Sequence, residues 1–141
     1  MTSAEEQRLI AEFRATGGRV GGALAGTPLL LLHHVGARTR TPRVTPLAYS
    51  CHGDGWVVIV ASNGGAHAHP GWLYNVRAHP DVTVEVGADT FAVRATEPDG
   101  RERHELWADV VERFPDVDRF QARTHRRIPL VVLRAPRPAG D

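Results

Sequence analysis

The residue types best suited to binding an anion are gathered in one short segment of the chain. Three arginines and two threonines lie within six positions: Arg38, Thr39, Arg40, Thr41 and Arg43. A guanidinium matches phosphate or carboxylate oxygens with two parallel hydrogen bonds, which the ammonium of a lysine does less well. The segment therefore predicts a site for a phosphate or carboxylate ligand, with a solvated surface turn as the alternative.

The distribution of charge along the chain favours the same interpretation. All 17 basic residues are arginines, yet the net charge is only +1. Residues 13–80 hold six arginines and one acidic residue, Asp54, so they carry +6 − 1 = +5 and the rest of the chain carries −4. A basic region in a nearly neutral protein indicates a small anionic ligand. Outside this region, Arg101, Arg103, Arg126 and Arg137 are interpreted as solvated surface. Nucleic acid is not expected as a partner, because domains that bind it usually have a much larger positive charge.

A second motif is the glycine-containing loop Ala61-Ser62-Asn63-Gly64-Gly65-Ala66, between a predicted strand and a predicted helix. Backbone N–H groups of such a loop, together with the helix N-terminus, can face a bound anion. It is not a Walker loop, because the lysine and its spacing are missing. Trp72 and Asn75 follow on the helix, where a central asparagine requires hydrogen-bond partners. Core packing of Trp72 and a purely geometric need for glycine are the alternatives.

The histidines and the cysteine form no pattern typical of a metal site or a nucleophile. His67 and His69 have no carboxylate at a ligand-like spacing, so no metal is predicted, and His69 is interpreted as a loop or cap residue. His33 and His34 should point to opposite sides of a strand. Cys51 is the only cysteine, so an internal disulfide is excluded and a buried thiol is expected.

No part of the sequence is typical of a membrane span or a signal peptide. The longest apolar run, 56–61, is far too short to cross a bilayer, and the first residues lack a basic region followed by an apolar one. We therefore expect a protein of the reducing cytoplasm.

Hydrophobic periodicity and turn residues predict the elements that position these motifs. A first helix follows the capping-box spacing of Ser3 and Glu6 and ends at Gly17. Strands are expected over 28–35, 43–50, 56–61, 82–86, 90–96 and 130–133, and further helices over 70–78 and from Thr96 to an apolar face that ends at Phe114. Pro46 lacks a backbone donor, so its strand should be bulged or lie at a sheet edge.

The strands occur in hairpins, which argues against a doubly wound sheet. Six short strands that close on themselves predict an α+β, mainly β fold, a small β-barrel with helices at its rim. We expect one domain over 1–141, made of an N-terminal helix and linker over 1–20, a barrel core over 28–134 and a frayed tail over 136–141. The first helix should pack on the barrel, with a peripheral membrane or partner contact as the alternative.

Taken in order, four motifs resemble the deazaflavin-dependent nitroreductase family of actinobacterial quinone reductases, over residues 28–134. They are Gly36-x-Arg38-x-x-x-Pro42-Arg43-x-x-Pro46-Leu47, Ala61-Ser62-x-Gly64-Gly65-Ala66, His69-Pro70-x-Trp72-x-x-Asn75, and the run from Phe114-Pro115 to Ile128-Pro129-Leu130-Val131. The resemblance implies a six-stranded split β-barrel of the FMN-binding type. It also implies an enzyme that transfers a hydride from reduced coenzyme F420, an 8-hydroxy-5-deazaflavin, to a quinone, enone or nitro-type acceptor.

The resemblance implies roles for individual residues as well. Arg38, Thr39 and Arg43 would hold the phosphate and the oligoglutamate tail of the coenzyme. The other coenzyme-binding residues would be Arg40, Thr45, Pro46, Leu47, Ala61, Ser62, Asn63, Gly64, Gly65, Trp72 and Asn75. Ser62 is the candidate catalytic residue, and the acceptor pocket would be lined by Ala48, Phe114, Val117 and Phe120.

The sequence departs from the family pattern at several of these positions. Asn63 stands where relatives usually have a basic residue, and Arg40, which stands where glycine is common, would replace that charge. The four acceptor-pocket residues lack the hydroxyls of the tyrosines that surround the acceptor in nitroimidazole-reducing relatives. We therefore expect an apolar pocket and a small hydrophobic acceptor.

Two other functions fit these residues. One is an FMN-dependent reductase with the same barrel, and the other is a non-catalytic protein that binds the deazaflavin or a nucleic acid. We expect a monomer or a homodimer, which would reach the inner face of the cell membrane only through its first helix.

Overall fold

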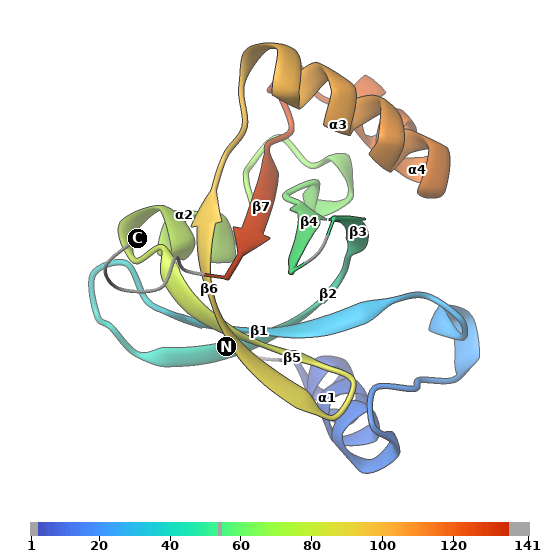
Figure 1. Ribbon diagram of the computed structural model, residues 1–141, viewed down its shortest axis with the longest axis vertical. Helices are drawn as coiled ribbons and strands as arrows, with labels where there is room; N and C mark the ends of the chain where they lie inside the picture. The colour runs from blue at the N-terminus through green and yellow to red at the C-terminus, as the bar shows by residue number, and fades with distance from the viewer. Residues whose placement is uncertain (1–2, 54, 136–141) are drawn as a thin grey trace.

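The computed structural model describes residues 3–53 and 55–135. The predicted tail over 136–141 and Asp54 of the predicted turn lie outside the described residues. Over that part of the chain, seven antiparallel strands form one strongly curled sheet (Figure 1). The strands are β1 (Leu29–Val35), β2 (Pro42–Ala48), β3 (Ser50–Gly53), β4 (Trp56–Val60), β5 (Asp81–Val86), β6 (Asp89–Thr96) and β7 (Leu130–Arg134).

The prediction of six strands is wrong, because the strand expected over 43–50 is two strands that separate at Tyr49. The order across the sheet is β2-β1-β5-β6-β7-β4-β3, so β2 and β3 lie at its two ends although a single residue separates them in the chain. One residue spans at most about 3.6 Å. The two ends of the sheet therefore meet at Tyr49, and the strongly curled sheet forms a half-barrel whose edge strands, β2 and β3, are not paired with each other. Pro46 lies in β2, and the prediction of a sheet edge is confirmed.

Four α-helices and two short 3-10 turns complete the described residues. They are α1 (Ala4–Thr16), η1 (Gly22–Leu24), η2 (Asn63–Gly65), α2 (Gly71–Ala78), α3 (Gly100–Arg113) and α4 (Asp116–Ala122). The predicted start of α1 is confirmed, since Ser3 Oγ accepts a hydrogen bond of 3.1 Å from the Glu6 N–H. Its predicted end is confirmed by Gly17, which has φ = +68°.

The start predicted for α3 is wrong, and α4 was not predicted. Thr96 still belongs to β6, where it pairs with Val132, and the cap of α3 is Asp99. The helix α4 has seven residues, too few to show a hydrophobic period in the sequence. The thiol of Cys51 is exposed rather than buried, because β3 turns Ser50 inward instead.

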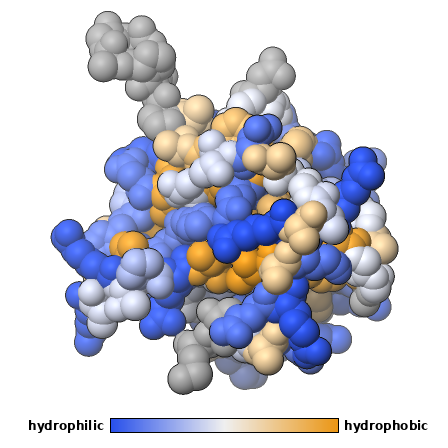
Figure 2. All heavy atoms as spheres, turned by 90° about the horizontal axis from the view of Figure 1, so that it is seen from below, coloured by the Kyte–Doolittle hydropathy of each residue, from blue (hydrophilic) through white to orange (hydrophobic). Residues whose placement is uncertain are grey.

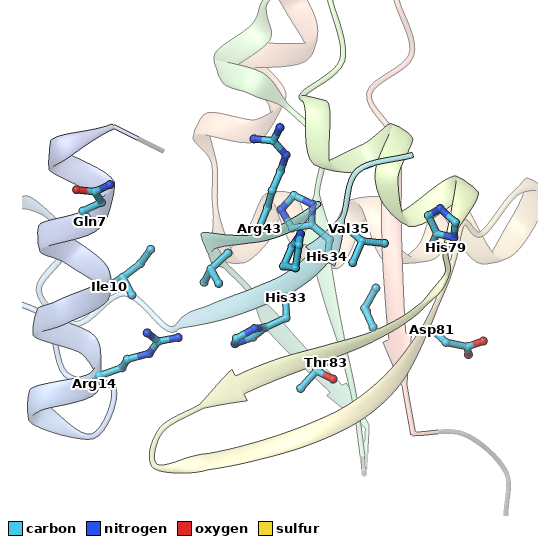
Figure 3. Close-up of a pocket in the computed structure, with 13 residues that line it drawn as sticks. Gln7, Ile10, Arg14, His33, His34, Val35, Arg43, His79, Asp81 and Thr83 are labelled. Atoms are coloured by element: carbon cyan, nitrogen blue, oxygen red, sulfur yellow. The ribbon is translucent and has the colours of Figure 1, made fainter. Parts of the chain in front are cut away.

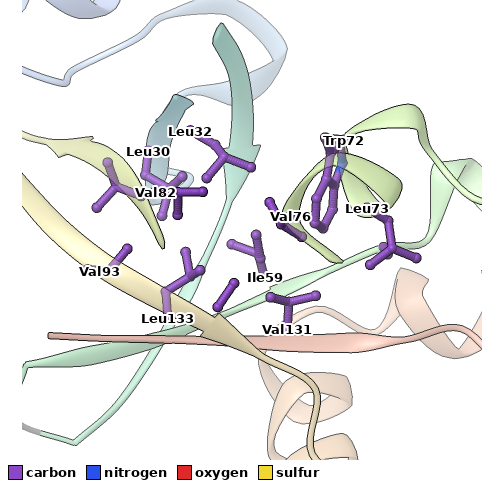
Figure 4. Packing of buried hydrophobic residues seen from close by; sticks show 13 residues of the cluster. Leu30, Leu32, Ile59, Trp72, Leu73, Val76, Val82, Val93, Val131 and Leu133 are labelled. Carbon is purple, nitrogen blue, oxygen red and sulfur yellow. The ribbon is translucent and has the colours of Figure 1, made fainter. Parts of the chain in front are cut away.

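The main core fills the inside of the curled sheet and is closed on one side by α2 (Figure 4). Leu30 and Leu32 of β1 point into this core, whereas Leu29 and Leu31 point to the other face, where Phe13 of α1 covers them. Both faces of β1 are thus buried, and this explains the unbroken apolar run in its sequence. A third cluster lies beneath α3 and α4.

The packing of α1 accounts for the narrow apolar face seen in its sequence. Leu9, Ile10 and Phe13 contact the cluster formed with β1, as predicted for a packing helix. The face in Figure 2 shows small hydrophobic patches among hydrophilic residues. No observation on the described residues supports a membrane contact through α1. Among the helices that the structure describes, none has both the length and the hydropathy needed to cross a bilayer.

Substitution of Leu30 by alanine should lower the free energy of unfolding by about 3 kcal/mol, because it leaves a cavity in the main core. Chemical denaturation measures this change. The control is Phe91→Ala on β6, whose side chain is 48% exposed and which should lose less than about 1 kcal/mol. Equal losses in the two variants would contradict the assignment of the core.

Candidate functional site

A cleft of about 900 Å³ lies between the β1–β2 turn, β2, the loop containing η2, and α2. Eleven of the residues predicted to bind a coenzyme line it: Arg38, Thr39, Arg43, Thr45, Pro46, Leu47, Ser62, Asn63, Gly64, Trp72 and Asn75. Arg40, Ala61 and Gly65 do not line it. The fold thus brings the arginine segment, the glycine-containing loop and α2 together around one cleft.

Arg38 and Arg43 give the cleft its positive charge. Both side chains are exposed, and in the described residues neither takes part in an ion pair. Glu6, at the start of α1, is the acidic residue on the wall of the cleft. The two guanidiniums therefore retain donors for an anionic ligand.

Two residues at the rim of the cleft have backbone conformations that L-amino acids rarely adopt. Arg40 has φ = +57° and Asn63 has φ = +47°. This left-handed region of backbone conformation favours glycine and tolerates asparagine. It gives a physical reason why glycine is common in relatives at the position of Arg40. Since Arg40 does not line the cleft, its position does not support the predicted replacement of a charge at Asn63. The Asn63 side chain instead donates to the Ala68 carbonyl at 3.1 Å.

The mid-helix Asn75 has the hydrogen-bond partners that its position requires. Its Oδ1 accepts from the Ala37 N–H at 2.9 Å, so its Nδ2 is the donor to His34 Nδ1 at 3.0 Å. The proton of neutral His34 then lies on Nε2, which donates to Thr45 Oγ1 at 2.8 Å. The Thr45 hydroxyl keeps its own proton free to donate into the cleft.

The environment of His34 keeps its imidazole neutral. Its ring is almost fully buried, and burial, with the nearby charges of Arg43 and His33, lowers the pKa of His34 from 6.5 to about 4. The predicted division of the two histidines is confirmed, because His33 lies on the more exposed side and bonds Glu85 Oε2 at 2.5 Å. Because His34 is neutral, its Nδ1 can accept from Asn75 while its Nε2 donates to Thr45.

The loop over 61–69 is held from behind by Arg126. Its guanidinium donates to the carbonyls of Ala61, Ser62 and Ala66 at 3.2, 2.7 and 2.8 Å, and to His69 Nδ1 at 2.9 Å. The interpretation of Arg126 as solvated surface is therefore wrong. It is wrong for Arg103 as well, which is buried over the Trp107 ring, whereas Arg101 is exposed and Arg137 lies outside the described residues.

Gly65 couples this loop to α4. Its φ is +85°, and a Cβ atom there would lie 2.8 Å from the Phe120 carbonyl oxygen. Any larger residue would push the loop and α4 apart. The close approach explains the second glycine of the loop without a contact to a ligand.

A second cavity, of about 760 Å³, lies on the other side of β2 and is mainly apolar. All four residues predicted for the acceptor pocket line it: Ala48, Phe114, Val117 and Phe120. Pro46, Leu47, Val60 and Ser62 line both this cavity and the cleft. The two spaces therefore adjoin along these four residues, which form a shared wall.

A third cavity, of about 490 Å³, lies between α1, β1 and β5 (Figure 3). Arg14 and His33 both line it, but both bond to Glu85, at 2.8 and 2.5 Å. Both donate within the protein, so among the arginines of this cavity only Arg43, which it shares with the cleft, has no acidic partner in the described residues. Over the described residues, no group of three His, Cys, Asp or Glu could hold a metal ion.

Sequence reasoning missed His34, His69, Glu6 and Arg126 as residues of this site. His34 could have been found, because an inward-facing histidine next to the arginine turn needs polar partners. Arg126 and Glu6 carry no local signal. The hydrogen bonds of Arg126 join segments about sixty residues apart, and Glu6 reaches the cleft from α1, so only the fold brings these residues to the site.

The strongly curled antiparallel sheet, with a cationic cleft and an adjoining apolar cavity, defines a split-barrel protein. The family model of the F420H(2)-dependent quinone reductases matches residues 6–135, and the chain belongs to this family. The resemblance stated from the motifs is thereby confirmed.

An F420H(2)-dependent quinone reductase of Mycobacterium tuberculosis (strain ATCC 25618 / H37Rv) is 43% identical over 125 residues, 86% of this chain and 83% of the relative. The solved structure of an F420-H2 dependent reductase, FDR-A, is 34% identical over 75% of this chain and 93% of its own, with a TM-score of 0.68. A structure described as a domain-swapped dimer is 33% identical, covers 92% of this chain and 94% of its own, and has a TM-score of 0.70. A FAD-binding protein of Mesorhizobium loti, 17% identical over 92% and 88% of the two chains, has a TM-score of 0.53 and shows the shared fold alone.

The stability of the protein should fall as the pH is lowered from 6.5 toward 4. The unfolded chain binds a proton at an ordinary histidine pKa of 6.5, whereas folded His34 resists protonation until about pH 4, so protons favour the unfolded state. The full difference in pKa corresponds to about 3 kcal/mol. Chemical denaturation across this range measures the effect, and His34→Gln should remove that part of the slope. Identical slopes for the two proteins would contradict the buried, neutral state of His34.

Proposed function

We propose that this protein reduces a quinone with a hydride from reduced coenzyme F420. The observation that carries the proposal is the wall shared by a cationic cleft and an apolar cavity, formed by Pro46, Leu47, Val60 and Ser62. A hydride is transferred over a short distance between two ligands held in contact. Because the two spaces adjoin along these residues, a flat ring in the cleft can contact an apolar acceptor in the cavity.

The residues of the cleft fit the chemistry of the coenzyme. Arg38 and Arg43, which have no acidic partner in the described residues, and Thr39 would bind the phosphate and the acidic tail. Pro46, Leu47 and Trp72 offer the apolar surface on which a ring can lie. Thr45 would donate to the ring, and the loop over 61–65 would surround the phosphate, with Ala61 and Gly65 shaping the loop rather than touching the ligand. Asn75 would act by orienting His34 and the β1–β2 turn.

When bound, the coenzyme supplies the hydride from a ring carbon, so the protein needs mainly to position both ligands and exclude water. Ser62 is the polar side chain of the shared wall, and Arg126 fixes its backbone. Its hydroxyl would donate a hydrogen bond to the acceptor oxygen or the ring where negative charge develops. The four aromatic and aliphatic residues of the second cavity would enclose a hydrophobic quinone.

Arg38→Ala and Arg43→Ala should each weaken binding of F420 by about 1.5–3 kcal/mol, since each removes charge-assisted hydrogen bonds. Fluorescence titration of the purified protein measures the dissociation constants. Arg40→Ala, in the same turn but outside the cleft, should have a smaller effect, and Arg94→Ala on β6 serves as the remote control. If Arg94→Ala weakened F420 binding as much as Arg38→Ala, the affinity would depend on net charge alone, and the proposed contact with Arg38 would be contradicted.

Ser62→Ala should lower the rate of quinone reduction at saturating coenzyme about 100-fold, because it removes one preorganised donor. Anaerobic stopped-flow measurement of coenzyme oxidation gives this rate, and Ser62→Thr, which keeps the hydroxyl, is the matched control. If Ser62→Ala oxidised the coenzyme at the wild-type rate, Ser62 would have no role in hydride transfer.

The same titration separates the proposed function from its alternatives. An FMN-dependent reductase would bind FMN more tightly than F420, and a non-catalytic binding protein would bind F420 but leave it reduced in the presence of a naphthoquinone. We expect tight binding of F420, weak binding of FMN and rapid oxidation of the reduced coenzyme. The cytoplasmic location, the monomeric or homodimeric state and the membrane contact of α1 stay predictions.

A further inference from the structure

A buried serine, a buried histidine and an exposed aspartate form a chain at the far end of the second cavity. Ser50 and His52 lie on the inward face of β3, and Asp109 lies on α3. Ser50 Oγ is 2.6 Å from His52 Nε2, and His52 Nδ1 is 3.4 Å from Asp109 Oδ2. Neither the family motifs nor the sequence reasoning drew attention to these three residues.

The three side chains differ in burial, so the series runs from a buried end at Ser50 to an exposed end at Asp109. Ser50 is 4% exposed and lines the cavity beside Ala48 and Phe114. The His52 side chain is 2% exposed, whereas the Asp109 side chain is 57% exposed. One end of the chain therefore reaches the proposed acceptor pocket and the other reaches solvent.

The surroundings of the His52 ring are an aromatic ring and two arginines on neighbouring elements. Its ring stacks on Trp56 of β4 with centroids 5.6 Å apart, and Arg134 of β7 covers that tryptophan. Arg113 of α3 bonds the Cys51 carbonyl at 2.6 Å. Burial and the charge of Arg113 lower the pKa of His52, and Asp109 acts in the opposite direction.

The Nδ1 atom of His52 is the one buried side-chain polar atom in the described residues that has no hydrogen-bond partner. The Asp109 carboxylate lies at ion-pair distance from it, 3.4 Å away, at the long end of hydrogen-bond range. A buried unsatisfied nitrogen lowers stability, so its presence points to a role other than holding the fold. Protonation of Nδ1 would convert this contact into an ion pair.

We propose that Ser50, His52 and Asp109 deliver the proton that a quinone acceptor needs after it has received a hydride. The proposal rests on the proposed function. Ser50 is the catalytic residue, because its hydroxyl touches the acceptor oxygen. His52 supplies the proton, and Asp109 is a positioning residue that stabilises the charged imidazole.

The step balances in atoms and charge. The hydride brings two electrons and one proton to the quinone, which becomes a hydroquinone monoanion with one negative oxygen. The Ser50 O–H bond breaks as its proton forms a bond to that oxygen, and Ser50 takes the Nε2 proton of the imidazolium of His52. The products are a neutral hydroquinone and a neutral histidine, and a proton taken up from the solvent through Asp109 restores the imidazolium of His52 before the next turnover.

The test compares Ser50→Ala, Ser50→Thr, Asp109→Asn and, as an exposed control on α3, Glu112→Gln. Three quantities are measured: the dissociation constant of F420, the pH dependence of naphthoquinone reduction, and the titration of His52 by NMR in the ligand-free protein. Ser50→Ala should lower kcat about 100-fold without changing F420 affinity, whereas Ser50→Thr keeps most of the rate.

The pH dependence separates a proton donor from a structural residue. The wild-type rate should fall as the pH rises through the pKa of His52, and Ser50→Ala should abolish this dependence. Asp109→Asn should shift the NMR titration and the fall in rate together to lower pH, because Asp109 raises the pKa of His52. Glu112→Gln should shift neither.

Two outcomes would overturn the proposal. One is a Ser50→Ala protein with wild-type kcat and pH profile, and the other is an Asp109→Asn protein in which the NMR titration moves and the rate profile does not. A wild-type protein that fails to bind F420 or to reduce the naphthoquinone would refute the proposed function itself. That result is distinct, because it appears before any substitution is made.

Discussion

The guanidinium of Arg126 holds the loop over 61–69 in place by donating to three backbone carbonyls and to His69. Both cavities of the site depend on this loop, because Ser62 lines each of them. Gly65 sets the distance from the loop to α4, and α4 in turn forms the wall of the second cavity. A side chain with no ligand-binding role thus determines where a ligand on either side can lie. Five N–H donors in a rigid plane suit an arginine to this task.

The fold supplies the other constraint, because the two ends of the curled sheet meet at Tyr49. Because β2 leads directly into β3 at the opposite end of the strand order, β2 has the cleft on one side and the apolar cavity on the other. Thr45 lines the cleft, Ala48 lines the apolar cavity, and Pro46 and Leu47 between them line both. The same arrangement turns Ser50 and His52 inward toward the second cavity, and this geometry underlies the proposed proton donor.

Much of the fold and of the site could be predicted from the sequence. The hairpins, the edge position of Pro46 and the caps of α1 follow from local patterns, and the ordered motifs were enough to name the family. The break at Tyr49 could not be predicted, because nothing in the run over 43–53 marks a change of sheet edge. Arg126 was misread as solvated, since its partners lie about sixty residues away. The prediction of a buried Cys51 thiol failed because successive side chains of a strand face opposite sides, and β3 turns Ser50 inward and Cys51 outward.

The proposed mechanism requires its two ligands to meet where the cleft and the apolar cavity adjoin, at Pro46, Leu47, Val60 and Ser62. A crystal structure of the protein with oxidised F420 and a naphthoquinone tests it most directly. The account predicts the deazaflavin ring in the cleft against Pro46 and Leu47, with the phosphate near Arg38 and Arg43. It predicts the quinone in the second cavity, with one oxygen near Ser62 or Ser50. A deazaflavin ring in the cavity between α1 and β5, or a quinone that is separated from the ring by intact protein, would contradict it.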